Sequence, residues 1–315
     1  LERPNNLMTN NYHVFAGNPL DRGEAERRDE GWIIDRTRDK SSKFLPLRDL
    51  NVLVSDDSDR SLAWIGPDDF DGIDLDSRFI FLGSMDGSAH FAIDVSGLDG
   101  SLGQLDLSGD RRYDDARAAT AYLSGPEAGI LAQAKAQLDW NRRHGFCSVC
   151  GHKTDMGRGG QVRKCPECKS QHFPRTDPVV IMLVHDGDRC LLGQSRGRLS
   201  RMRTYSALAG FMDQAESIEE AVRREVMEEA GIQAINVRYH SSQPWPFPSS
   251  LMIGCHAEAA TTAISMDNEE MSDVRWFQRD EVLAALEGKS ETLTVPGAIA
   301  IAHHLIKAWA NGKVE

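Results

Sequence analysis

Three glutamates in the second half of the chain, Glu225, Glu228 and Glu229, have the type and spacing for metal chemistry. Residues three and four positions apart are neighbours on a helix surface, so the three side chains share one helical face. Like charges this close repel each other, and a bound cation would remove the repulsion. Carboxylate oxygens suit Mg²⁺ and Mn²⁺, and Mg²⁺ is commonly held by carboxylates together with substrate phosphates. The spacing therefore indicates a catalytic Mg²⁺ or Mn²⁺ site for a substrate that carries phosphates.

The residues around these glutamates decide between two interpretations. One is a solvated acidic helix laced with Arg223 and Arg224, which is the commoner explanation for an isolated acidic cluster. However, Gly210 and Glu216 complete the pattern G-x5-E-x7-R-E-U-x-E-E-x-G-U, in which U is aliphatic. A chance match to all its fixed positions is rarer than about one in 10⁵ at average residue usage. The complete pattern favours catalytic carboxylates.

A helix must position these carboxylates, and the sequence predicts one over residues 217–230. This segment contains no Gly or Pro, and Gly231 follows it as a C-cap residue. Ile218, Val222 and Val226 recur every four residues, which predicts a buried stripe on the opposite face.

Four of the six cysteines form the pattern C-x2-C-x14-C-x2-C: Cys147, Cys150, Cys165 and Cys168. The chain shows no secretory signal, so this spacing predicts a Zn²⁺ site and not two disulfides, incidental thiols being the alternative. Four thiolates close a tetrahedral site, so we expect one structural Zn²⁺ per chain. Cys190 and Cys255 lie in apolar runs and are expected to be core residues.

The composition is that of an ordinary globular protein, with 315 residues, a net charge of −12 and a pI near 5.3. No apolar run reaches the roughly 18 residues that span a membrane. With no signal segment at the start, we expect a cytoplasmic protein. The acidic balance argues against non-specific affinity for nucleic acid, but not against action on one end of an RNA. Arg196, Arg198, Arg201 and Arg203 form a basic loop that could meet RNA phosphates, although a solvated loop is equally consistent.

The chain divides into three parts, and an α+β fold is expected. Residues 1–125 contain short apolar runs between turns and predict an antiparallel, β-rich N-terminal domain. Residues 126–175 hold a linker helix from Glu127 to Arg143 and the cysteine module. Residues 176–315 predict a mixed sheet between helices, beginning with a hairpin of 179–184 and 189–192.

A second motif, Gln243-Pro-Trp-Pro-Phe-Pro-Ser-Ser250, follows the acidic helix. Proline donates no ladder hydrogen bond, so this segment is not expected inside a sheet. The prolines stiffen the loop, and Trp245 and Phe247 offer flat faces to a base or nicotinamide, a contact of about 1–3 kcal/mol per base in nucleic-acid sites. A rigid structural loop or an interface plug is the alternative.

These three motifs, in this order, resemble the NADH pyrophosphatase branch of the Nudix hydrolases, and the resemblance covers roughly residues 127–310. It implies a Nudix α/β/α sandwich preceded by a Cys₄ zinc ribbon and an N-terminal domain. It also implies a homodimer that hydrolyses the pyrophosphate of NAD(H) to NMN(H) and AMP and removes NAD caps from RNA 5′ ends. A Nudix hydrolase of ADP-ribose, dinucleoside polyphosphates or an oxidised nucleotide is one alternative. A zinc-ribbon adaptor without catalysis is another.

The resemblance also implies roles for individual residues. The ligands of the catalytic metal would be Glu225, Glu229, Glu270 and the carbonyl of Ala209, with Glu269 as the register alternative to Glu270. Glu228 would assist in metal binding or proton transfer, and the identity of the general base stays open. The substrate-binding residues would be Phe173, Phe211, Gln243, Pro244, Trp245, Pro246, Phe247, Pro248, Ser249, Ser250, Ala300 and Arg117.

Overall fold

A computed structural model describes residues 13–56, 60–70, 79–98, 110–197 and 204–314, so Arg198, Arg201 and Arg203 of the basic loop lie outside the described residues. The chain forms two compact units. The first consists of Leu1–Arg175 and Trp245–Ser249, and the second of Thr176–Pro244 and Ser250–Glu315. Among the described residues, no helix is both long enough and apolar enough to cross a membrane.

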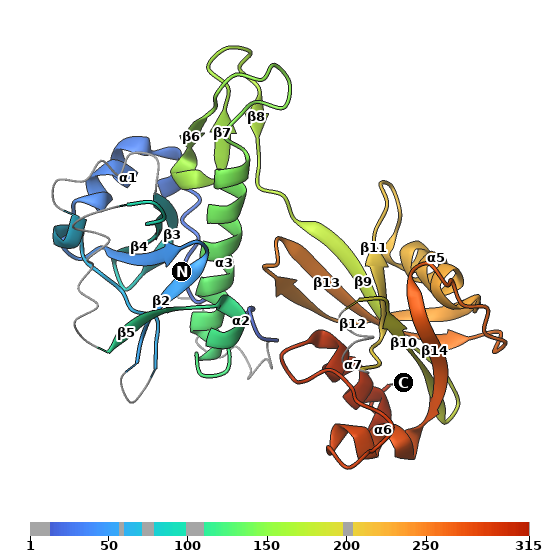
Figure 1. Cartoon of the computed structure of the whole chain (residues 1–315). Coiled ribbons are helices and arrows are strands. Elements are labelled where there is room, and N and C mark those ends of the chain that lie inside the picture. The colour runs from blue at the N-terminus through green and yellow to red at the C-terminus, as the bar shows by residue number, and fades with distance from the viewer. Residues whose placement is uncertain (1–12, 57–59, 71–78, 99–109, 198–203, 315) are drawn as a thin grey trace, which may run out of the picture. The chain divides into compact units, whose positions relative to one another are not determined.

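The first unit contains a five-stranded sheet in the order β3-β4-β1-β2-β5 (Figure 1). Its strands are β1 (Lys43–Arg48), β2 (Asn51–Ser55), β3 (Phe79–Met85), β4 (Ser88–Asp94) and β5 (Arg111–Asp114). The sequence predicts antiparallel pairing, but β1 and β4 are parallel. Each belongs to its own antiparallel pair, β1 with β2 and β4 with β3, and the two pairs join with β1 and β4 running the same way.

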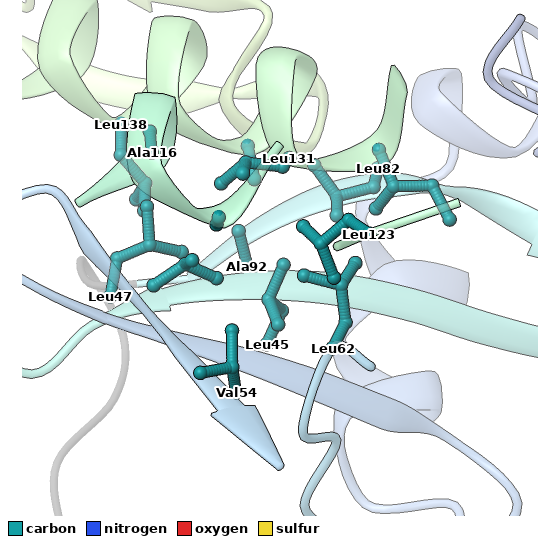
Figure 2. Packing of buried hydrophobic residues seen from close by; sticks show 14 of the residues in the cluster. Leu45, Leu47, Val54, Leu62, Leu82, Ala92, Ala116, Leu123, Leu131 and Leu138 are labelled. Atoms are coloured by element: carbon teal, nitrogen blue, oxygen red, sulfur yellow. The ribbon is translucent and has the colours of Figure 1, made fainter. Parts of the chain in front are cut away.

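Helix α3 (Gly125–Arg143) covers one face of this sheet (Figure 2). Leu131 and Leu138 of the helix pack on Leu45 and Leu47 of β1, and burial of each leucine contributes about 1.5–3 kcal/mol. The helix begins two residues earlier than predicted because Ser124 and Glu127 form a capping box and Pro126 is tolerated in the first turn.

Shorter elements complete the first unit. They are α1 (Glu30–Thr37), α2 (Ala116–Ala119) and the 3₁₀ turns η1 (Glu26–Arg28), η2 (Pro67–Phe70) and η3 (Arg158–Gly160). The cysteine module is a three-stranded antiparallel sheet of β6 (Asp155–Gly157), β7 (Val162–Lys164) and β8 (Gln171–His172).

The second unit contains a six-stranded mixed sheet in the order β12-β13-β9-β10-β14, with β11 paired to β9. The strands are β9 (Asp177–Asp186), β10 (Arg189–Ser195), β11 (Leu208–Phe211), β12 (Ala234–Trp245), β13 (Ser250–Ala259) and β14 (Met271–Gln278). The predicted hairpin is confirmed as the antiparallel pair of β9 and β10, whereas β13 runs parallel to β9.

Helices lie on both faces of this sheet, so the predicted α/β/α sandwich is confirmed. They are α5 (Ile218–Ala230), α6 (Arg279–Leu286) and α7 (Ile301–Ala310) (Figure 1). Successive side chains of a strand point to opposite faces. Val180 and Met182 of β9 accordingly pack in the cluster under α5, and Ile181 and Leu183 pack in the cluster under α6 and α7. Cys190 and Cys255 are buried, as predicted.

The proline-rich motif differs from the expected loop. Strand β12 extends through Gln243 and Pro244 to Trp245, and β13 begins at Ser250, so only residues 246–249 form the turn. The motif is therefore not a loop throughout, but the prediction that it avoids the interior of a sheet holds. Strand β12 lies at the edge of its sheet, where the missing N–H of a proline removes no ladder hydrogen bond.

Candidate active site and zinc centre

Both ends of α5 are fixed by the residues that the sequence singled out. At the start, Ser217 and Glu220 form a capping box, which satisfies two backbone N–H groups. At the end, Gly231 adopts the left-handed conformation with φ 68°, and a Cβ there would lie 2.7 Å from the Cβ of Ser265. The helix bearing the carboxylates is thus the predicted one, with Val222 and Val226 buried beneath it.

The glycine that opens the acidic pattern packs directly against the first glutamate of the cluster. Gly210 lies in β11 opposite Val180 of β9. A Cβ on Gly210 would lie 1.9 Å from Cδ of Glu225, so no larger residue fits while Glu225 keeps its place. Glu225 is only 7% exposed, and its burial raises the pKa of its carboxyl group. The spacing of Gly210 and Glu225 in the pattern is therefore a packing requirement.

Arg224 connects three of the carboxylates. Its Nε donates to Glu216 Oε1 at 2.6 Å, and its Nη1 donates to Glu225 Oε1 at 2.8 Å and to Glu228 Oε2 at 2.9 Å. Its Nη2 donates to the carbonyl of Phe211 and to Glu216. The hydrogen bonds from Arg224 hold the pKa of Glu216 at about 2, so Glu216 remains a carboxylate. Arg224 is the arginine of the acidic pattern, for which the sequence predicted no role, and it anchors the helix to β11 and orients Glu225.

Glu229 is the most perturbed acid of the site. It is 6% exposed, and its Oε2 is buried without a hydrogen-bond partner. Burial raises its pKa to about 8, with further contributions from the charges of Glu225 and Glu270, and a hydrogen bond from the backbone of Ala209 opposes the shift. Ala209 therefore lies beside Glu229, as its expected role as a ligand requires.

Glu228 and Glu270 border these buried acids from the exposed side. Glu228 is exposed and bound by Arg224. Glu270 immediately precedes β14, and its charge raises the pKa values of both Glu225 and Glu229, so it lies near them. Glu269 is not among the main causes of either shift, and its backbone N–H donates to Asp267 Oδ1. The arrangement favours Glu270 over the register alternative.

This carboxylate site fits a hard divalent cation. The donor atoms are oxygens, and the unpartnered Oε2 of Glu229 is an oxygen whose burial is otherwise uncompensated. The two buried acids, with the charges of Glu228 and Glu270 nearby, would be balanced by a cation, for which Arg224 supplies only part of the positive charge.

The four predicted zinc ligands lie together in the first unit. The sulfur atoms of Cys147, Cys150, Cys165 and Cys168 all lie within 4.8 Å of one another. The Sγ–Sγ distances are 3.6 Å for Cys147 and Cys168 and 3.4 Å for Cys150 and Cys165. A tetrahedron with Zn–S bonds of 2.3 Å has edges of about 3.8 Å, so the four thiols match a zinc site.

The predicted substrate residues fall into different settings. Phe173 and Phe211 are both exposed, Phe173 in the first unit and Phe211 in the second. Ala300 is the N-cap residue of α7, and Ser250 opens β13. Residues 246–249 form the turn that includes Pro246, Pro248 and Ser249.

Gln243 differs from its expected role as a residue that lines the cleft. Its side chain is fully buried, its Nε2 donates to the carbonyl of Ile299 at 2.8 Å, and its Oε1 accepts from the N–H of Ile301 at 2.8 Å. Both ends of the amide therefore hold the segment that carries Ala300. A buried amide with both ends satisfied acts on a ligand only through the backbone that it positions.

Trp245 and Phe247 pack within the first unit together with residues that the sequence did not associate with them. Phe15 contacts both rings edge-on, at centroid distances of 5.9 Å and 5.6 Å. The guanidinium of Arg117 lies 5.3 Å from the ring centre of Trp245 and 4.1 Å from that of Phe247. Lys135 lies 4.9 Å from the ring centre of Phe247. The structure thus brings the predicted Arg117 to the aromatic motif. No local signal points to Phe15, which is far away in sequence.

Three family models match the chain over consecutive segments. Residues 41–140 match an NADH pyrophosphatase-like rudimentary NUDIX domain, residues 142–173 an NADH pyrophosphatase zinc ribbon domain, and residues 175–294 a NUDIX domain. The N-terminal β-rich domain is thus similar to a rudimentary form of the domain type that follows it.

Individual relatives agree with these matches. The chain is 32% identical to an NAD-capped RNA hydrolase of Schizosaccharomyces pombe. The alignment is 367 residues long with its gaps and covers 98% of this chain and 97% of that protein. It is 39% identical over 245 residues to human NAD(P)H pyrophosphatase NUDT13, mitochondrial, and the match covers 71% of this chain and 68% of that protein. It is 48% identical over 202 residues to NAD-capped RNA hydrolase NUDT12 of Macaca fascicularis, covering 61% of this chain. The chain spans only 43% of the length of that last relative.

Proposed function

We propose that this chain, which belongs to the Nudix family in its NADH pyrophosphatase branch, hydrolyses the pyrophosphate bond of NAD(H) to NMN(H) and AMP. We propose further that it removes NAD caps from RNA 5′ ends, the activity named for the relatives from Schizosaccharomyces pombe and Macaca fascicularis. The observation that carries the proposal is the buried pair of Glu225 and Glu229 behind Gly210, with one carboxylate oxygen of Glu229 left without a partner.

In this proposal Glu225, Glu229, Glu270 and the carbonyl oxygen of Ala209 hold Mg²⁺ or Mn²⁺. When bound, the ion would neutralise charge on the diphosphate and lower the pKa of a water molecule. Arg224 keeps Glu225 in position through its 2.8 Å ion pair and stays protonated, since its carboxylate partners raise its pKa.

A glutamate takes the proton from the attacking water. Glu228 is the candidate outside the proposed ligand set, because it is exposed and close enough to the same cluster to share Arg224 with Glu225.

The substrate would be oriented by the aromatic and proline-rich residues. We propose that Phe173 and Phe211, whose rings are exposed, stack on the dinucleotide, and that Ala300 contacts it through its main chain. Gln243 supports this contact by holding residues 299–301. Arg117, Trp245 and Phe247 form one packed group on which the selectivity for a nicotinamide dinucleotide would rest.

Three further properties belong to this proposal. One structural Zn²⁺ per chain would hold the ribbon, which the four clustered thiols support. A reducing compartment, for which we propose the cytoplasm, is supported by the six cysteines, none of which forms a disulfide. A homodimer is implied by the family resemblance, and sedimentation tests it directly.

The experiment is a comparison of NADH, NAD⁺, ADP-ribose and NAD-capped RNA as substrates, with Mg²⁺ and with Mn²⁺, for the wild type and Trp245→Ala. If Trp245 orients the dinucleotide, the variant should lose roughly 10- to 100-fold in kcat/KM for NADH, the loss of one stacking contact. ADP-ribose, which lacks nicotinamide, should be affected less. No turnover of NADH or capped RNA by the wild type would refute the proposal.

ADP-ribose and dinucleoside polyphosphates remain the second candidates because they share the diphosphate bridge. The observation that favours them is the packing of Trp245 and Phe247 on Phe15, which gives both rings a structural role. Equal losses on NADH and ADP-ribose in Trp245→Ala, or a large fall in its melting temperature, would favour this alternative.

A further inference from the structure

The zinc ribbon has a charge opposite to that of the rest of the chain. Residues 142–173 contain seven Lys and Arg against two Asp and Glu, a formal charge of +5, which four thiolates around one Zn²⁺ would reduce to +3. The whole chain carries −12, so all other residues together carry −17. Five of the seven basic residues of the ribbon are exposed: Arg142, Arg143, Lys153, Lys164 and Lys169. Although the whole chain is acidic, the zinc ribbon therefore exposes a basic surface.

Two of these cations have no acidic partner. Arg142 and Arg143 pair with Asp139, and Lys164 lies 3.6 Å from an acid of α1. Among the described residues, Lys153 and Lys169 lie within 4 Å of no carboxylate. Lys169 Nζ donates only to the carbonyl of Pro166, at 2.5 Å. Each zinc knuckle thus presents one uncompensated ammonium group, Lys153 directly after the first knuckle and Lys169 within the second.

The same module exposes large apolar side chains. Phe146 is 71% exposed, Val149 is 70% exposed and Phe173 is 59% exposed. Isolated exposed apolar residues are ordinary, but three within one small module are not. Phe146 and Lys153 form an antiparallel β-bridge, which places their side chains on the same face as direct cross-strand neighbours. An exposed aromatic ring and an unpaired ammonium group are thus held side by side next to Cys147.

We propose that this face of the ribbon binds the single-stranded RNA that follows an NAD cap, a partner that rests on the proposed decapping function. Lys153 and Lys169 would contact backbone phosphates, and Phe146 would stack on an unpaired base. Proteins that bind single strands combine these two elements, cations along the backbone and aromatic platforms for the bases. A duplex offers no unstacked base, so paired RNA should bind more weakly.

Binding is tested first without any catalysis. The probe is a fluorescent oligoribonucleotide with a 5′-hydroxyl end and no cap, titrated with the full zinc-loaded chain at several salt concentrations. The variant is Lys153→Glu with Lys169→Glu. Removal of two phosphate contacts should lower the affinity by on the order of 10-fold or more and reduce the salt slope by about 1.4, at about 0.7 per contact for single strands.

A matched control separates this surface from net charge. Lys40→Glu with Lys313→Glu changes the charge of the chain by the same amount at exposed positions outside the ribbon, and should bind like the wild type. Phe146→Ala should lower the affinity by at least roughly 5-fold, the loss of one stacked base. Ile34→Ala, also an exposed apolar side chain of the first unit, should not.

The last measurement separates this inference from the proposed activity. With zinc content and melting temperature unchanged, both ribbon variants should keep the wild-type kcat/KM for NADH and lose kcat/KM for NAD-capped RNA. A wild type inactive on NADH would refute the proposed activity, while the binding assay would still decide on the ribbon. Equal RNA affinity in ribbon and control variants would overturn the inference. So would a change in sedimentation of Phe146→Ala at constant RNA affinity, since the face would then be a contact between two copies.

Discussion

The substitution Glu229→Gln should stabilise the protein without Mg²⁺ or Mn²⁺ at about pH 8, even as it removes most of the activity. Glu229 is almost fully buried, its Oε2 has no partner, and the charges of three neighbouring acids add to the unfavourable electrostatics. Glutamine keeps the shape and removes the charge. A residue that serves metal binding should show this conflict between stability and function.

The magnitude follows from the pKa of Glu229, which burial raises to about 8 from its usual value of 4.5. Between these two values the folded state keeps a proton that the unfolded chain has released. The free energy of unfolding therefore falls as pH rises through this window, by up to about 1.4 kcal/mol per pH unit from this group. Over the whole window the limit is about 4–5 kcal/mol. Because relaxation and water entry reduce such penalties, we expect a gain of on the order of 2 kcal/mol in the variant.

The assay is urea unfolding of the wild type and Glu229→Gln at several pH values, with and without added Mg²⁺ or Mn²⁺. Chelators are avoided because they would also remove zinc. The variant should lose the fall in stability between about pH 5 and 8, while the wild type should gain about 2.7 kcal/mol from metal at 100 times its Kd. Turnover of the variant should fall by on the order of 10²-fold or more. A metal-free variant that is less stable than the wild type at the upper pH, or that shows the same pH slope, would refute the reasoning.

Three other substitutions test separate parts of the structure. Gly210→Ala should lower turnover by on the order of 10²-fold, because the added Cβ would displace Glu225. In the control Gly145→Ala the added Cβ meets no atom within 4 Å, so turnover should stay at the wild-type value. Equal steady-state rates of the two variants would contradict this prediction. Cys147→Ser should lower the zinc content measured by metal analysis, and the soluble yield, before it changes the chemistry. Burial lowers the pKa of His256 to about 4. Below about pH 6.5 the unfolded chain therefore takes up a proton that the folded chain does not, and the free energy of unfolding falls as the pH drops. His256→Gln should weaken that acid sensitivity in urea unfolding, by up to about 2 kcal/mol at pH 5, and an unchanged pH slope would count against it.

Features specified by residues close together in sequence were predictable. The helix that carries the acidic pattern begins at a capping box and ends at a left-handed glycine, and both signals lie within four residues of the helix ends. The zinc site follows from the spacing of two knuckles, because four thiols at that spacing have few other uses. The two short apolar runs on either side of the Asp186-Gly187 turn likewise placed strands β9 and β10.

The remaining features depend on contacts between distant segments, which no local pattern records. Gln243 looks like a loop residue in sequence, but its amide bonds a segment 56 residues away and is buried by that contact. The parallel pairing of β1 with β4 depends on how two separate strand pairs meet. Arg224 resembles a surface charge until β11 brings the carbonyl of Phe211 and the carboxylate of Glu216 to it.

The sequence by itself determined which residues are proposed to carry the chemistry, because metal ligands and helix caps are selected by residue type and short spacing. The tertiary structure decided how strongly each is perturbed. Glu228 and Glu229 are adjacent and chemically identical, yet Glu228 is exposed beside Arg224 while the pKa of Glu229 is raised to about 8. Burial and the charges of neighbours set that difference, and both arise only when β11, α5 and the segment before β14 pack together.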